Sequence, residues 1–367
     1  MRKFIFILLA FILFFISPTT LLPSAEKSNP SLHVASFWNK VNNTIVQCGL
    51  CPRRCVLANG QRGFCTARIN KGGTLYTLAY NNPVTLQVDP IEKKPFFHVM
   101  PGESAFSLAV AGCNMRCLFC QNWQISQSLP DETSNYNLTP KEVVNLAIKS
   151  KSKFIAYTYT EPTIFYEYML DIAKIARQKG LRNVMHTCGY INREPLVKLL
   201  KYMDAVNVDL KSFDSAFYHK MGTMAELQPV LDTLKTIKAE GVWLEVTNLL
   251  IPGENDSPEQ IRKMCAWIKE NLGDEVPLHF SRFRPAFRLA NLPPTPVEKM
   301  EEAYKIAKEA GLKYVYLGNL PGAAEESTYC PKCNKLLISR SGYIINEINI
   351  KDGRCKFCGY KIAGIWK

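Results

Sequence analysis

The sequence predicts an α/β protein built around a partial or near-full (β/α) barrel of the TIM type. Apolar runs of strand length alternate with amphipathic runs of helix length from Ser104 to Leu317, which is the pattern of parallel β/α units. Clusters of cysteines before and after this region predict two small metal-binding modules. The expected segments are a leader (1–23), a linker (24–43), an N-terminal four-cysteine module (44–103), the barrel (104–322) and a C-terminal ribbon (326–367).

The composition is that of a folded protein with reduced thiols. Of the 367 residues, 47% are hydrophobic and 21% are charged, which is enough for a sizeable core. The net charge of +13 is scattered along the chain, which predicts a solvated basic surface, with an acidic partner or nucleic acid as the alternative. Eleven of the 13 cysteines fall into three tight groups, and such close spacings are typical of metal ligands in a reducing compartment.

The leader has the pattern of a signal peptide. Arg2 and Lys3 precede thirteen apolar residues, Phe4 to Ile16. This run is shorter than the ~20 residues that a membrane span needs, and the basic residues before it would direct the rest of the chain outward. A cleaved signal, a membrane anchor and a mis-assigned start codon are three explanations that stay open.

The first cysteine group follows the linker. Cys48, Cys51 and Cys55 lie in the run CGLCPRRC, and Cys65 follows ten residues later. Four thiolates on short turns form a complete ligand set for zinc or for an auxiliary Fe–S cluster, and thiolate suits both metals. Free cysteines in a small cap are the alternative. After this group, Lys93, Lys94 and His98 lie in a segment that either faces an active site or is a solvated connector.

Seven strands and the helices between them are predicted for the barrel. Proline-containing N-cap sequences begin three of the helices, at Thr139, Ser257 and Thr295, and Gly180 and Gly311 end two helices. In the helix from Glu259, Cys265 falls on the apolar face and is predicted to be a core residue. The strands are Phe106–Val110, Phe154–Thr158, Asn183–Thr187, Ala205–Asp209, Trp243–Leu250, Leu278–Ser281 and Tyr314–Leu317.

The loop after the first strand carries the second cysteine group, Cys113, Cys117 and Cys120, in a C-x3-C-x2-C array. Fe–S clusters normally take four cysteines, so three thiolates can hold three irons of a cubane cluster and leave the fourth iron open for chemistry. A zinc knuckle that lacks one ligand and three unrelated buried thiols are the alternatives. This loop is predicted to be the centre of the protein.

Other polar side chains follow the remaining strands. Because chemistry in β/α barrels takes place at the carboxyl ends of the strands, we expect these side chains to converge on the cysteine loop. Any one of them could instead be a helix cap or a salt bridge. They are Glu161, His186, Asp209 with Lys211, Glu245 with Asn248, and His279 with Arg282.

These motifs resemble the pyruvate formate-lyase activating enzyme branch of the radical S-adenosylmethionine (radical SAM) superfamily. The shared steps are the cysteine array with Gln121-Asn122-Trp123, Thr160-Glu161-Pro162, and Asp209-Leu210-Lys211. The runs CGLCPRRC, DPIEKKP and GNLPG (318–322) are similar to the radical SAM component of the AmmeMemoRadiSam system. The resemblance covers the chain from about Cys48 to its C-terminus.

The resemblance implies that Cys113, Cys117 and Cys120 bind a [4Fe–4S] cluster. It further implies that Glu161 binds the amino group of SAM, that Asp209 and Lys211 lie near its ribose or carboxylate, and that Ala111 and Gly112 let the backbone approach it. The chain departs from the branch at His186-Thr187-Cys188-Gly189, where activating enzymes usually have Asp-Thr-Asn-Gly. That Asp helps to hold a monovalent cation in the family, so the departure argues against the same cation site.

The third cysteine group lies near the C-terminus. Cys330 and Cys333 form one C-x2-C knuckle, and Cys355 and Cys358 form a second. Two knuckles separated by strand-like residues predict a zinc ribbon, with zinc favoured over a rubredoxin-type iron. Because four ligands close the coordination shell, the role of this site is predicted to be structural or to dock a partner.

Two functional hypotheses follow. The first is a radical SAM enzyme that reductively cleaves SAM to a 5′-deoxyadenosyl radical, takes electrons from a flavodoxin or ferredoxin, and acts on an unidentified substrate such as a protein encoded nearby. The second is a multi-metal Fe–S electron-transfer or scaffold protein without SAM chemistry. Nucleic acid is not expected as a partner. Because the cluster and thiols favour a reducing environment, the catalytic body is expected in the cytoplasm, either free or held at the membrane by the leader.

Overall fold

A computed structural model describes residues 25–27 and 32–367. The leader expected at 1–23 lies outside the described residues, so the interpretations based on it are not tested. Within the described residues, every helix is too short or too polar to cross a membrane.

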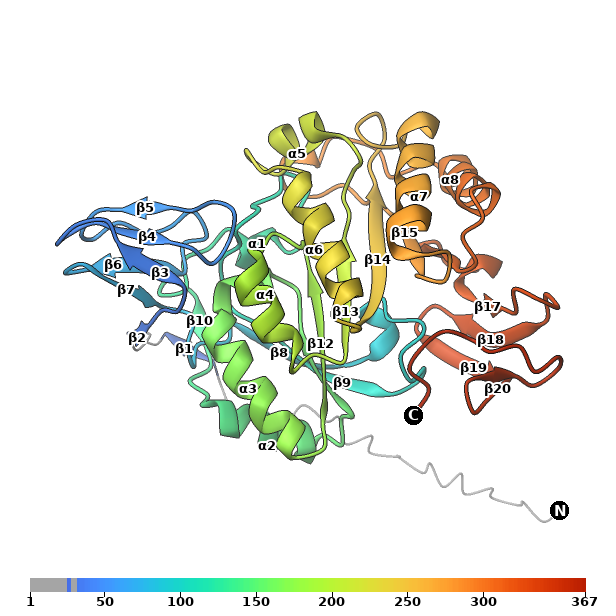
Figure 1. Cartoon of the computed structure of the whole chain (residues 1–367), viewed down its shortest axis with the longest axis horizontal. Coiled ribbons are helices and arrows are strands. Elements are labelled where there is room, and N and C mark those ends of the chain that lie inside the picture. Colours follow the sequence, from blue (N-terminus) through green and yellow to red (C-terminus); the bar gives the residue numbers. More distant parts are fainter. Residues whose placement is uncertain (1–24, 28–31) are drawn as a thin grey trace, which may run out of the picture.

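One eight-stranded sheet forms the centre of the molecule (Figure 1). Its strand order is β16-β15-β14-β13-β12-β11-β9-β8, and the seven strands from β9 to β16 are parallel. β8 (Thr85–Pro90) joins the sheet antiparallel to β9. The other strands are β9 (Ser104–Ala109), β11 (Phe154–Tyr157), β12 (Arg182–Thr187), β13 (Ala205–Asp209), β14 (Trp243–Leu250), β15 (Leu278–Arg282) and β16 (Val315–Gly318).

The parallel α/β sheet confirms the predicted fold class, but the barrel is not confirmed. β8 and β16 are the two edge strands and do not pair with each other in the described chain, so the sheet stays open. β8 falls inside the predicted N-terminal module (44–103) although it pairs with β9 over six residue pairs. The expected boundary at 103/104 therefore separates two hydrogen-bonded neighbours.

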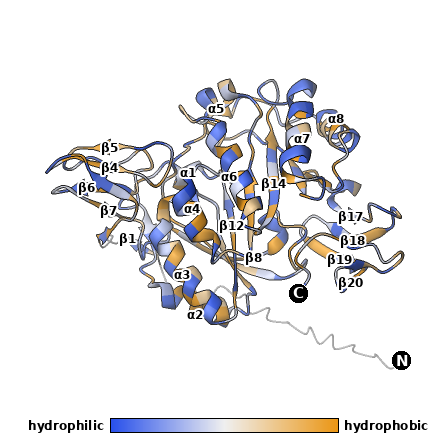
Figure 2. Cartoon of the chain, viewed as in Figure 1, coloured by the Kyte–Doolittle hydropathy of each residue, from blue (hydrophilic) through white to orange (hydrophobic). Residues whose placement is uncertain are grey.

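Amphipathic helices connect the parallel strands. Figure 1 shows α3, α4, α6 and α7 along the same face of the sheet, and Figure 2 shows polar and apolar residues alternating along these helices. Cys265 in α7 is fully buried, as predicted. The helices are α1 (Trp123–Ser126), α2 (Pro140–Lys149), α3 (Tyr166–Gln178), α4 (Arg193–Leu200), α5 (Ser215–Met221), α6 (Gln228–Ala239), α7 (Pro258–Leu272) and α8 (Val297–Glu309), with short 3-10 turns at η2 (Ile91–Lys93), η3 (Pro162–Phe165), η4 (Phe287–Leu289) and η5 (Ala324–Glu326).

Two of the three predicted N-caps are confirmed. Thr139 forms a complete capping box with Glu142, and the Ser257 side chain accepts a hydrogen bond from the Gln260 N–H. The prediction for Thr295 is wrong, because α8 begins one residue later and has no side-chain cap. The Thr295 hydroxyl is buried and donates instead to the Leu250 carbonyl at 2.6 Å, so a tertiary contact replaces the local one.

Small antiparallel sheets lie at the two ends of the large sheet (Figure 1). At the end of the sheet next to the C-terminal ribbon, Phe97, Tyr314 and Tyr316 pack against Leu337 and the cysteines of the ribbon. Strands β1, β2 and β3 fall within the predicted linker, residues 24–43. The N-terminal strands are β1 (Glu26–Lys27), β2 (His33–Val34), β3 (Trp38–Lys40), β4 (Val46–Cys48), β5 (Val56–Leu57), β6 (Arg68–Lys71) and β7 (Thr74–Thr77), with β10 (Ser134–Asn135) paired to β1; the C-terminal strands are β17 (Thr328–Tyr329), β18 (Leu336–Ser341), β19 (Ile344–Ile348), β20 (Ile350–Lys351) and β21 (Arg354–Cys355).

Candidate active site

A large cavity of about 1140 Å³ opens at the carboxyl ends of the parallel strands. The loop after β9 and residues at the ends of β11 to β16 line it, which is the place that the parallel topology predicts. The C-terminal ribbon contributes Arg340 and Tyr343 to its wall. The sequence-predicted residues that line it are Cys113, Cys117, Cys120, Glu161, His186, Asp209, Lys211, His279, Lys93 and Lys94.

Three cysteine sulfurs are available at one wall of this cavity. Cys113, Cys117 and Cys120 all lie on the loop that follows β9, and Ser126 lies within hydrogen-bond distance of Cys120, with its Oγ 3.2 Å from the sulfur. Burial raises the pKa of the Cys113 thiol and raises that of Cys117 to about 11. Protonated thiols do not bind metal well, so metal binding here must release protons.

The donor set fits a [4Fe–4S] cluster better than a single ion. The three sulfurs do not form one of the tight ligand groups of the described chain, whose ligand atoms lie within 4.8 Å of one another. Cysteines that bind different irons of one cluster are farther apart than ligands of one ion. Three all-thiolate ligands beside open space would leave one iron accessible to a second molecule.

Glu161 is a buried carboxylate without a cationic partner among the described residues. It is 2% exposed, and the turn at η3 places its two oxygens between the ends of β11 and β12. One oxygen accepts hydrogen bonds from the Thr163 hydroxyl at 2.6 Å and the Thr187 hydroxyl at 2.6 Å, and the other accepts from the Cys188 N–H at 2.8 Å. Neutral donors hold the carboxylate in place but leave its charge uncompensated, so it favours an ammonium group from a ligand.

Asp209, at the end of β13, forms a second charged cluster with Lys211 and His186. Asp209 accepts from Lys211 Nζ at 2.8 Å and contacts His186 Nε2 at 2.8 Å. Burial alone would raise the pKa of Asp209, but Lys211 and His186 together hold it well below the usual range. Burial likewise opposes the charge on Lys211, whereas Asp209 raises the Lys211 pKa above its ordinary value. The pair is therefore ionised at neutral pH.

The departure at position 186 has a clear structural counterpart. His186 occupies the position at which activating enzymes usually have Asp, and its imidazole contacts the Asp209 carboxylate. In this chain His186 and Lys211 therefore both contact Asp209.

Several of the polar residues that were expected at the carboxyl ends of the strands do not line the cavity. Glu245 is fully buried below the cavity, where it accepts from the N–H groups of Phe97 and His98 and contacts His279 Nε2 at 2.6 Å. Asn248 and Arg282 bond to backbone carbonyls and do not line the cavity. His98 is also buried away from it, between the Ala363 carbonyl and the Tyr316 hydroxyl.

Gly112 lies against the N-terminal module. It adopts a positive φ of 104°, and a Cβ at this position would lie 2.5 Å from the Cys65 carbonyl oxygen. Neither Ala111 nor Gly112 lines the cavity. Glycine is needed here because the N-terminal module packs directly on the cysteine loop.

The sequence patterns gave no role to three residues that line the cavity, Asn122, Tyr159 and Arg340. Asn122 donates to the Tyr159 carbonyl at 2.8 Å and so ties the cysteine loop to the end of β11. The Tyr159 ring lies 4.0 Å from Lys94 Nζ, and both side chains bond to Asp89. Arg340 of the C-terminal ribbon also lines the cavity. No local sequence pattern predicts a contact between segments this far apart in the chain.

The four C-terminal cysteines form a compact group. The Sγ atoms of Cys330 and Cys358 are 3.6 Å apart, and those of Cys333 and Cys355 are 3.8 Å apart. Zinc–sulfur bonds of about 2.3 Å place tetrahedral sulfurs about 3.8 Å apart. This geometry suits one tetrahedral ion.

The chain is similar to several known proteins. The Radical SAM superfamily model matches residues 108–265. An uncharacterized protein of Methanocaldococcus jannaschii, MJ0808, is 48% identical over 332 residues, which cover 89% of this chain and 98% of that protein. A pyruvate formate-lyase-activating enzyme of Clostridium pasteurianum is 25% identical over 217 residues, covering 54% of this chain and 87% of the enzyme. The solved structure of Streptococcus suis SuiB bound to S-adenosylmethionine is 12% identical with a TM-score of 0.47, over 66% of this chain and 56% of SuiB.

Proposed function

The chain belongs to the radical SAM superfamily, and we propose that it binds a [4Fe–4S] cluster through Cys113, Cys117 and Cys120 and reductively cleaves SAM. When bound, the cluster would supply the electron that converts SAM into methionine and a 5′-deoxyadenosyl radical, which abstracts hydrogen from the substrate. The cofactors carry this chemistry, and the protein binds, orients and shields them. The observation that carries the proposal is the three-cysteine loop beside the uncompensated carboxylate of Glu161 in one cavity.

Different residues of the cavity would bind different groups of SAM. Glu161 would receive the amino group, because a charge-assisted hydrogen bond to an ammonium compensates its buried charge. Asp209 and Lys211 would lie near the ribose or the carboxylate of SAM. Their mutual ion pair fixes both side chains before the ligand binds, which lowers the ordering cost.

Within the superfamily, we assign the chain to the activating-enzyme-like branch and, more narrowly, liken it to the radical SAM component of the AmmeMemoRadiSam system. Two observations support this assignment: the runs CGLCPRRC and DPIEKKP in the sequence, and the similarity to the activating enzyme of Clostridium pasteurianum. The substrate stays open, with a protein encoded nearby as our first candidate and a flavodoxin or ferredoxin as the electron donor. We further propose zinc at the C-terminal ribbon, since the sulfur spacing suits it, and a cytoplasmic location for the catalytic body.

Anaerobic reconstitution with iron and sulfide, followed by reduction in the presence of SAM, tests the proposal. We expect 5′-deoxyadenosine from the wild-type chain and none from Cys117→Ala, because the cluster loses a ligand. Cys265→Ala is the matched control, since this buried thiol in α7 is not in the cavity. An electron-transfer or scaffold protein would bind iron but form no deoxyadenosine, and that result would refute the proposal.

A further inference from the structure

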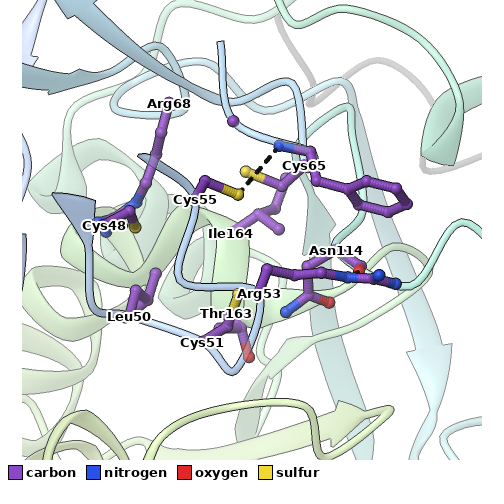
Figure 3. A pocket seen from close by; sticks show the side chains of 12 residues that line it. Cys48, Leu50, Cys51, Arg53, Cys55, Cys65, Arg68, Asn114, Thr163 and Ile164 are labelled. Carbon is purple, nitrogen blue, oxygen red and sulfur yellow. Dashed lines mark hydrogen bonds between the residues drawn. The ribbon is translucent and has the colours of Figure 1, made fainter. Parts of the chain in front are cut away.

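The N-terminal cysteines surround a second, smaller cavity. Cys48, Cys51, Cys55 and Cys65 come from the end of β4 and the loops on either side of β5, and Figure 3 shows them around a common space. Leu50 and Ile164 close this space with apolar side chains. Four thiols in a mostly apolar enclosure form a complete metal-binding ligand set.

The spacing of these sulfurs separates them from the C-terminal group. The C-terminal sulfurs lie within 4.8 Å of one another, as a single tetrahedral ion requires. Among the described residues the N-terminal sulfurs do not form such a tight set, and no three of them do. A cubane cluster, whose four cysteines bind four different irons, needs the wider arrangement. The same chain therefore has one zinc-like and one cluster-like group of four cysteines.

The N-terminal group lies directly against the central cysteine loop. The Cys65 carbonyl packs on Gly112, the residue before Cys113. Asn114, the residue after Cys113, lines the N-terminal cavity beside Arg53, as Figure 3 shows. Arg53 lies between Cys51 and Cys55 in the sequence, and its side chain donates to the Asn114 carbonyl at 3.0 Å. Neighbouring residues of one loop thus contact both metal sites.

A buried cation lies beside the N-terminal sulfurs. Arg68 is 1% exposed, with one terminal nitrogen 3.6 Å from Cys48 Sγ, and it forms an ion pair with Glu167 at 2.5 Å. Charge and hydrogen bonds to sulfur set the reduction potential of an Fe–S cluster. A guanidinium that donates to sulfur stabilises the more negative, reduced form, although the Glu167 carboxylate balances its charge. Such a group is useful in a site that accepts electrons, whereas a structural zinc site never changes its oxidation state.

We propose that Cys48, Cys51, Cys55 and Cys65 hold a second [4Fe–4S] cluster and that this cluster is the electron-entry site for the central loop. The site accepts one electron from an external donor of the ferredoxin or flavodoxin class, whose own centre is oxidised by one electron. It passes one electron to the cluster at Cys113, Cys117 and Cys120 and returns to its oxidised state, with no bond made or broken in the protein. The destination of the electron rests on the proposed function, but the identity of the metal does not.

The first experiment removes the central site and analyses the metals that stay. The full chain with Cys113→Ala, Cys117→Ala and Cys120→Ala is reconstituted anaerobically with iron, sulfide and zinc. We expect about four irons per chain and a cubane signature by Mössbauer spectroscopy, with zinc kept at the ribbon. Zinc and no iron at the N-terminal group would overturn the proposal.

The wild-type chain provides the same readout if the triple variant does not fold. We expect about eight irons per chain and two distinguishable EPR signals after reduction, because two clusters of four irons are present. A matched Cys330→Ser variant should lose zinc and keep both signals. About four irons and one signal in the folded, zinc-replete wild type would contradict a second cluster.

The second experiment separates electron entry from SAM chemistry. In Cys55→Ser, deoxyadenosine formation is measured once with a reduced flavodoxin and once with dithionite, a small reductant that can reach the central site directly. We expect the ratio of the flavodoxin-driven to the dithionite-driven rate to fall by at least an order of magnitude, with loss of one EPR signal. An unchanged ratio after that signal is lost would overturn electron entry. If the wild type forms no deoxyadenosine with either reductant, the proposed function fails while the iron count still tests the cluster.

Discussion

The carboxylate of Glu161 offers the sharpest test of the SAM site. Replacement by glutamine keeps the size of the side chain but removes its charge and turns one acceptor into a donor. Glu161 now accepts from the two hydroxyls of Thr163 and Thr187 and from the N–H groups of Thr163 and Cys188. A charge-assisted hydrogen bond to the amino group of SAM is worth about 1.5–3 kcal/mol, so its loss should weaken binding by about 10- to 150-fold.

Calorimetric titration of the anaerobic, reconstituted protein with SAM measures this loss. Glu161→Gln and Glu161→Ala should both weaken SAM binding while the iron content stays at the wild-type level, because neither change removes a thiolate. Glu259→Gln is the matched control, since this glutamate is 76% exposed on α7 and does not line the cavity. Wild-type SAM affinity in a folded, iron-replete Glu161→Ala protein would refute the assignment of the amino group to Glu161.

Three further predictions concern the residues around the site. Burial disfavours the charge on Asp89, but hydrogen bonds from Lys93, Lys94 and Tyr159 lower its pKa to about 2; the stability it contributes, about 2 kcal/mol, is present above pH 4 and is lost as the pH falls toward 2. The difference in free energy of unfolding between wild type and Asp89→Asn in urea should therefore shrink over that range, and a constant difference would contradict the pKa. Arg53→Ala should lower the free energy of unfolding by about 1–3 kcal/mol, because it leaves carbonyls of the cysteine loop and of the turn after α5 without their donor; calorimetry checks this. Cys355→Ser should remove one zinc and lower the melting temperature while leaving the iron content unchanged, and iron loss of the same size in elemental analysis would show that the ribbon is not an independent metal site.

The sequence determined the features that depend on spacing along the chain. The seven parallel strands, the cap at Thr139 and the buried position of Cys265 followed from local periodicity and from turn chemistry. The three cysteine groups were visible for the same reason, since residues on one loop are close in sequence as well as in space. The step Thr160-Glu161-Pro162 placed a carboxylate at the end of a strand, and Glu161 lines the cavity there because it precedes the turn at η3.

Only the tertiary structure decided which rim side chains reach the cavity. Alternate residues of a strand face opposite sides, so Thr247 and Leu249 line the cavity, whereas Asn248 between them points to the other side. Glu245 has the correct parity but lies deeper, where His279 and two backbone N–H groups enclose it. The sequence shows which residues of a strand share a face. How far each of these side chains lies from the cavity depends on how the strand is shifted against its neighbours.

Contacts between distant segments were equally beyond the reach of local patterns. Gly112 has a neighbour that no local pattern shows, because a Cβ at this position would lie 2.5 Å from the carbonyl oxygen of Cys65, 47 positions earlier in the chain. Thr295 has the local sequence of an N-cap, but a carbonyl of β14 captures its hydroxyl. The physical reason is the same in both cases: local signals are worth about 1 kcal/mol each, and a buried polar group or a close backbone contact outweighs them.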